Sequence, residues 1–150
     1  MGLRARGLRL ETQSSHTPTL PYPPQGADVD AARILEWRAG MTALAALPNV
    51  HVKLSGLEYV MGGWTADAGK TATVKGLVRE VVSLFGHRRC MFASNFPVDL
   101  FMSREAGGEV AFPALYDAFH ALVEDLPIEE RTALFHNTAA RVYRVPARPE

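Results

Sequence analysis

Three stretches of the chain place apolar residues at the spacing of three and four that marks the buried face of an amphipathic helix, and a fourth helix is predicted after them. The clearest runs from Val74 to Phe85, and Gly86 follows at the position where helices commonly end. Another begins at Phe112 and has Pro113 in its first turn, where proline is tolerated best. The predicted helices cover residues 28–47, with Asp28 or Asp30 as the N-cap, 74–85, 112–126 and 128–143.

Two shorter stretches have the pattern of strands in a parallel sheet. Residues 50–55 alternate strictly, so that Val50, Val52 and Leu54 share one face. Residues 90–93 form a continuous apolar run, which is typical of a strand that is covered on both faces. The sequence therefore predicts an α/β fold.

The loops around these strands differ in length. Each strand is followed by a loop of about a dozen residues or more, 57–72 and 98–110, whereas the turns that lead into the strands have about two to four residues. Parallel sheets carry their functional groups at the carboxyl ends of the strands. We expect a functional site at that end.

Two strands are too few for a stable parallel sheet, so the 150 residues resemble the last part of a larger α/β protein. Residues 28–145 have the alternating pattern of such a fold. Residues 1–27 do not, because they carry three arginines against one acid and then a cluster of prolines. We expect a disordered or non-homologous tail over residues 1–27 and a second tail over residues 146–150.

The composition narrows the choice of partners. The chain has 16 Lys and Arg against 16 Asp and Glu, so no net field attracts nucleic acid or an anionic membrane. No stretch approaches the roughly 18 apolar residues that span a bilayer. Cys90 is the only cysteine, and the fold therefore needs no intrachain disulfide. These features favour a cytoplasmic protein that binds a small molecule and that self-associates through the apolar faces of an incomplete sheet.

Asn95 and Asp99 follow the second strand directly and are the catalytic candidates. Asn95 shares a face with Met91 and Ala93, so its side chain either contacts a ligand or satisfies the backbone before Phe96. Asp99 either accepts a proton or binds a metal, or it caps a local turn. Both pairs of alternatives stay open.

Three further polar residues are candidates for substrate binding. Lys53 and Ser55 lie on the polar face of the first strand, where Lys53 binds an anionic substrate or forms an internal ion pair. Ser94 precedes Asn95. The five histidines show no metal-ligand spacing, so the sequence assigns no metal ligand, and Cys90 is expected to be a small buried hydrophobe.

Three blocks of the sequence resemble the C-terminal part of the amidohydrolase-related TIM-barrel hydrolases. They are residues 49–56 (NVHVKLSG), 85–99 (FGHRRCMFASNFPVD) and 130–143 (ERTALFHNTAARVY). The resemblance implies a partial (β/α)₈ TIM barrel that consists of the last two βα units with the preceding and terminal helices. It also implies a lactonase, another hydrolase or a decarboxylase, and several such enzymes use a divalent metal, zinc or manganese, held by histidines of earlier strands.

The sequence departs from this family at one position. The family's last strand commonly ends in Gly-Ser-Asp-aromatic-Pro, and Asn95 matches the Asp of that motif. Asparagine cannot act as a carboxylate base and is a weaker metal ligand. The resemblance favours a hydrolase that attacks a lactone, ester or amide carbonyl with water, provided that the missing barrel half is supplied. The alternatives are a truncated fragment, inactive or partner-dependent, and a decarboxylating lyase.

Overall fold

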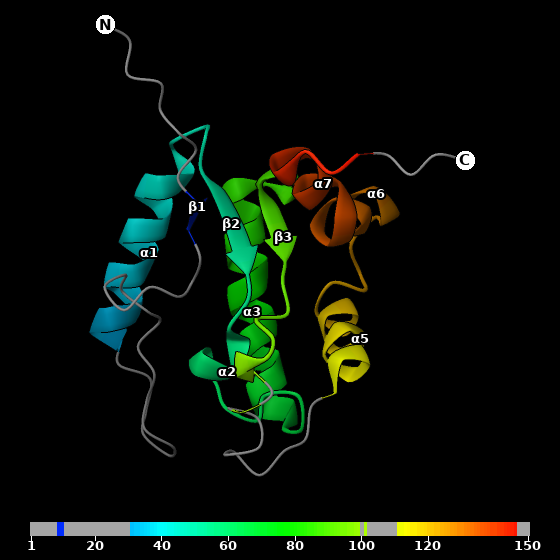
Figure 1. Cartoon of the computed structure of the whole chain (residues 1–150). Coiled ribbons are helices and arrows are strands. Elements are labelled where there is room, and N and C mark those ends of the chain that lie inside the picture. The colour runs from blue at the N-terminus through cyan, green and yellow to red at the C-terminus, as the bar shows by residue number, and fades with distance from the viewer. Residues whose placement is uncertain (1–8, 11–30, 100, 102–110, 147–150) are drawn as a thin grey trace, which may run out of the picture.

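A computed structural model describes residues 9–10, 31–99, 101 and 111–146 of the chain (Figure 1). Their strands form one parallel sheet in the order β1-β2-β3, with bounds β1 (Arg9–Leu10), β2 (His51–Leu54) and β3 (Cys90–Phe92). Arg9 lies opposite His51, and Val52 lies opposite Cys90. Since all three strands are parallel, their carboxyl ends meet at one edge, the lower one in Figure 1.

Helices surround this sheet. They are α1 (Ala31–Ala45), α2 (Leu57–Val60), α3 (Ala68–Phe85), the 3₁₀ turn η1 (His87–Arg89), α5 (Phe112–Leu122), α6 (Ile128–Thr132), the π-helix η2 (Ala133–Asn137) and α7 (Thr138–Tyr143). Figure 1 shows α3 behind the sheet, with α1 beside β1 and α5 on the side of β3. Within the described part of the chain, every helix is too short or too polar to cross a membrane.

The core lies between the sheet and α3, and α5 closes it on one side. Val50, Val52 and Leu54 are all buried there, which confirms the predicted inner face of the first strand. The Phe119 ring of α5 is completely buried and stacks on Phe92 with ring centroids 4.8 Å apart. The aromatic stack therefore fixes α5 against β3.

The loop expected over residues 57–72 is partly helical, so that prediction is wrong. It contains α2, and α3 begins at Ala68 rather than at Val74. The Asp67 side chain accepts a hydrogen bond of 2.9 Å from the Lys70 amide and caps α3. The first turn of α3 carries no buried apolar residue, and its helical period is therefore invisible in the hydrophobic pattern.

The start of the chain also differs from expectation. Arg9 and Leu10 pair with β2 as an edge strand, so the prediction that nothing before Asp28 belongs to the fold is wrong at these two residues. A strand of two residues is too short to show a period of two. The remaining residues of 1–27, the proposed caps Asp28 and Asp30, most of the loop 98–110 and residues 147–150 lie outside the described part.

Candidate functional site

A tight turn follows β3 and positions Asn95 and Asp99. Asn95 has a φ of 53°, in the left-handed region that asparagine adopts more easily than most residues. Its carbonyl oxygen accepts hydrogen bonds from the amides of Val98, at 2.9 Å, and Asp99, at 3.3 Å. These bonds turn the chain back on itself, so that the side chain of Asp99 returns to that of Asn95.

The two side chains are in direct contact. Nδ2 of Asn95 donates to Oδ1 of Asp99 over 2.6 Å. Asp99 is only 2% exposed, and its second oxygen, Oδ2, is buried without a hydrogen-bond partner. Burial raises the pKa of Asp99 to about 6, although the bond from Asn95 opposes that rise. A carboxyl group with this pKa exchanges protons close to neutral pH, as a general base must.

A second acid, Glu58, lies at the same end of the sheet. It belongs to α2, which follows β2 and lies below the carboxyl ends of the strands in Figure 1. Glu58 is 1% exposed, Oε2 accepts a 2.8 Å bond from the Gly63 amide, and Oε1 has no partner. Burial is the main cause that raises the pKa of Glu58, and the charge of Asp99 adds to it, whereas the Gly63 amide and Lys70 oppose it.

Glu58 was absent from the sequence-based candidates. It stands four residues beyond Leu54 in a stretch without an apolar period, so the pattern did not distinguish it from a solvated loop residue. The available signal was its position, since an acid that closely follows a buried parallel strand lies at the functional end of the sheet.

The other predicted residues have separate positions. Ser94 accepts a 3.3 Å bond from the Phe96 amide on its Oγ and thereby supports the turn. Lys53 is half-buried on β2 opposite Met91, and Ser55 is buried directly after β2. Asn95 and Asp99 are in contact, and the substrate-binding roles of Ser94, Lys53 and Ser55 stay predictions.

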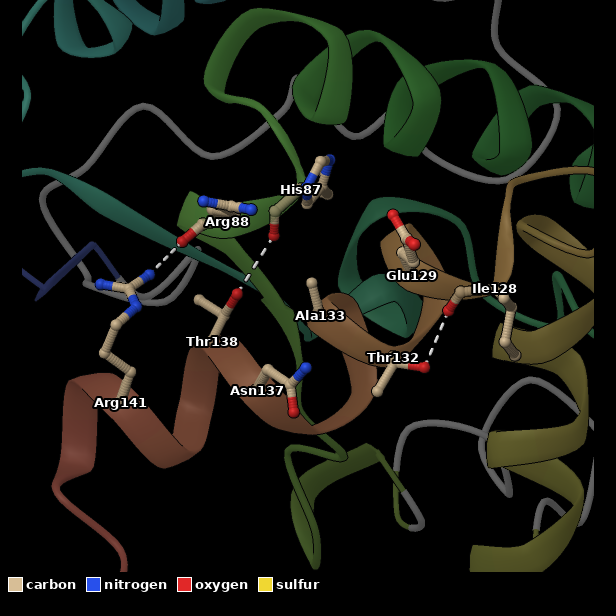
Figure 2. A pocket seen from close by; sticks show the side chains of 9 residues that line it. All are labelled: His87, Arg88, Ile128, Glu129, Thr132, Ala133, Asn137, Thr138 and Arg141. Carbon is tan, nitrogen blue, oxygen red and sulfur yellow. Dashed lines mark hydrogen bonds between the residues drawn. The ribbon is translucent and has the colours of Figure 1, made fainter.

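A cavity of about 520 Å³ lies at the opposite end of β3 (Figure 2). Its lining residues come from η1, α6, η2 and α7 and are His87, Arg88, Ile128, Glu129, Thr132, Ala133, Asn137, Thr138 and Arg141. Thr138 donates a 3.1 Å bond to the His87 carbonyl, and Arg141 donates to the Arg88 carbonyl. These bonds join α7 to the amino end of β3, whereas Asp99 and Glu58 lie beyond its carboxyl end.

The described residues offer little to a metal ion or to a nucleophilic thiol. Among them, no group of three or more His, Cys, Asp or Glu side chains is placed to hold a metal. Glu58 and Asp99 alone do not make up the three protein ligands of a usual catalytic zinc site, so the described residues do not by themselves fit a catalytic zinc ion. Burial raises the pKa of the Cys90 thiol to about 12, which makes it a poor nucleophile.

The chain is similar in sequence to known proteins. Protein y4mH of Sinorhizobium fredii is 39% identical over 121 residues, which are 80% of this chain and 37% of that protein. An L-fucono-1,5-lactonase of Burkholderia multivorans is 35% identical over 126 residues, which are 79% of this chain and 38% of the lactonase. The chain thus spans well under half the length of these relatives.

Solved structures show the same fold. A crystal structure of an amidohydrolase from Burkholderia multivorans with bound HEPES matches at a TM-score of 0.67 and 31% identity, over 79% of this chain and 40% of that one. A second crystal structure of an amidohydrolase from that organism, with bound zinc, matches at a TM-score of 0.64 and 30% identity. The match covers 77% of this chain and 39% of that one. The amidohydrolase family model matches residues 3–145, which also include β1. With nearly its whole length matched, the chain belongs to the amidohydrolase family.

Proposed function

We propose that the chain carries the carboxyl-end part of a hydrolase site that opens a lactone or a related ester, with Asp99 as the general base. The buried carboxyl of Asp99 is the observation that supports this proposal most directly. One of its oxygens is held by Asn95, the other has no partner, and its pKa is about 6. Similarity to an L-fucono-1,5-lactonase favours a small sugar lactone as the substrate.

In the proposed reaction, a water oxygen attacks the carbonyl carbon while Oδ2 of Asp99 takes one of the water protons. Asn95 holds Asp99 in place through Nδ2. It also favours the ionised form of the carboxyl, because a donated hydrogen bond stabilises the negative charge. Lys53, Ser55 and Ser94 bind polar groups of the substrate at the same end of the sheet.

The barrel itself is part of the proposal. β1, β2 and β3 correspond to consecutive strands of a (β/α)₈ barrel, and both outer strands have only one neighbour in the described sheet. The site therefore works with the remaining strands present, either on the same polypeptide or on a partner. Exposed apolar side chains such as Leu35, Phe101 and Ile128 suit such an association.

Hydrolysis of L-fucono-1,5-lactone, followed by proton release, tests the proposal. The chain is assayed alone and after co-expression with the part of the B. multivorans lactonase that it does not match. We expect Asp99→Asn to lower turnover by about 100-fold or more, the usual scale for a general base. Asp117→Asn, which alters an exposed acid of α5, is the matched control. Full activity in Asp99→Asn, or release of carbon dioxide in place of lactone opening, would contradict it.

A further inference from the structure

Two buried carboxyl groups at one end of a sheet need more explanation than a single base provides. Glu58 and Asp99 are 1% and 2% exposed, and each has one oxygen without a hydrogen-bond partner. Buried polar atoms are nearly always paired in proteins, because leaving one unpaired costs about 1–3 kcal/mol. The two free oxygens, Oε1 and Oδ2, therefore mark places where a ligand or water is expected to bind.

The sheet brings these acids together from distant parts of the chain. Leu54 pairs with Phe92 in the last register position of β2 and β3, and the Ala93 amide donates to the Leu54 carbonyl over 3.2 Å. Glu58 follows β2 and Asp99 follows β3, and neighbouring strands of a sheet lie roughly 4.8 Å apart. Their charges interact, since ionised Asp99 raises the pKa of Glu58.

The two acids differ in their hydrogen-bond donors and in the charges that act on them. From this difference we assign one acid as the proton acceptor and the other as the proton donor. Asp99 receives its bond from the side chain of Asn95, while Glu58 receives one from the backbone amide of Gly63. The charge of Lys70 opposes the rise in the pKa of Glu58, but the Lys70 ammonium already donates a 2.7 Å bond to the Gly62 carbonyl. The charge of ionised Asp99 favours the protonated form of Glu58, because two neighbouring carboxylates do not ionise independently.

We infer that Glu58 is the proton donor of the site, giving the proton of its carboxylic acid to the leaving-group oxygen while Asp99 takes a proton from the attacking water. This inference rests on the proposed function and extends it to a base-and-acid pair. It narrows the substrates to compounds whose leaving group is an alkoxide, such as lactones and alkyl esters. An aryl oxide departs without a proton and gains little from an acid.

The proton balance of the cycle is complete. Water adds to the carbonyl carbon and loses one proton to Asp99, the ring C–O bond breaks, and the alkoxide oxygen takes the proton of Glu58. The product is a hydroxy acid. Asp99 is then protonated and Glu58 ionised, and transfer of the proton from Asp99 to Glu58 restores the starting state.

Two substrates with different leaving groups test the inference. In Glu58→Gln, which keeps the shape of the side chain and the acceptor for Gly63, we expect kcat/KM for L-fucono-1,5-lactone to fall by about 100-fold. For p-nitrophenyl acetate we expect less than about a fivefold change. Glu124→Gln, at a side chain that is 70% exposed, should leave both rates unchanged. Equal loss on both substrates, or no loss on the lactone, overturns the inference.

Asp99→Asn separates this inference from the proposed function. If Asp99→Asn abolishes turnover of both substrates and Glu58→Gln changes neither, the role of Glu58 fails and the base stays in place. If Asp99→Asn changes the turnover of neither substrate, the proposed function is wrong, and the role of Glu58 as proton donor is wrong with it.

Titration of the ¹³C-labelled glutamate carboxyls gives a readout that does not depend on activity or on folding of a Glu58 variant. One signal in the wild-type chain should titrate above the other glutamates, and its midpoint should fall in Asp99→Asn, because a neighbouring negative charge is removed. A set of glutamate signals that titrate together in the wild type overturns the pairing.

Discussion

The amide nitrogen Nδ2 of Asn95 lies 2.6 Å from Oδ1 of Asp99, so a residue in the turn after β3 supports an acid four positions later. The sequence left two roles open for Asn95, a ligand contact or a backbone contact. Its carbonyl oxygen closes the turn, and its side chain holds the carboxyl. The family motif has an Asp at position 95, and in this chain a carboxyl group, that of Asp99, is in contact with the Asn95 that stands there.

Removal of the Asn95 side chain should move the pH dependence of hydrolysis. The bond from Nδ2 lowers the pKa of Asp99, so Asn95→Ala should raise it above its value of about 6. The rising limb of kcat/KM against pH then shifts to higher pH, while the plateau falls less than in Asp99→Asn. Asn137→Ala, at an exposed residue of η2, is the control. A limb that stays in place would show that the bond does not tune the base.

Asp99→Asn should stabilise the fold at neutral pH while it removes activity. The folded pKa of Asp99, about 6, is above its unfolded value of 3.8, so the folded state binds more protons between these values. The wild type therefore loses stability as the pH rises from about 4 to about 6, by about 2 kcal/mol. Urea unfolding at pH 4 and pH 7.5 measures the free energy of unfolding. Asp99→Asn should be more stable than the wild type only at the higher pH. A gain of equal size at both values would rule out the buried charge as its source.

Cys90 should resist thiol reagents in the folded chain. It is completely buried in β3, and burial raises the pKa of its thiol to about 12, so almost no thiolate forms at pH 8. A disulfide reagent such as Ellman's should react in urea at least about 100-fold faster than in buffer. Rapid reaction in buffer would mean that the sheet opens at β3 without global unfolding.

Arg89 should stabilise the fold through the ends of two helices. Its guanidinium donates to the carbonyl of Phe85 at 2.8 Å and to those of Ala45 and Leu47 at 3.0 and 2.9 Å, where α3 and α1 end. Arg89→Ala should lower the free energy of unfolding by about 2–3 kcal/mol, and Arg89→Lys should recover only part of it. Arg88→Ala, at the exposed neighbour, should change it by less than about 0.5 kcal/mol. Similar losses at both positions would contradict this role.

The elements that could be predicted are those with a buried apolar face. Val50, Val52 and Leu54 revealed β2, and the stripe from Val74 to Phe85 revealed most of α3, because burial on one side produces a period in the sequence. β1 and α2 produce none. They are too short, and their placement depends on contacts with β2 and on the turn after it.

The sequence allowed two residues of the candidate site to be identified, but not the contacts between them. Asn95 and Asp99 were found because they follow a buried strand, yet their spacing of four did not reveal that one donates to the other. The burial of Glu58 depends on its tertiary surroundings at the end of the sheet, which local sequence does not encode. The expected single helix over residues 128–143 is present as α6, η2 and α7 in direct succession, with a π-helix that the apolar pattern does not distinguish.

The order of the strands also determines how the chain can fold. Arg9 and His51 are 42 positions apart, and Val52 and Cys90 are 38 apart, so neither pairing begins as a hairpin. Each requires closure of a loop that contains a whole helix, α1 or α3, and the entropy of that closure is lost before the pairing compensates it. Early formation of these helices shortens both loops. These long separations in sequence favour sheet assembly as the slow folding step, with β2 as the strand on which both neighbours assemble.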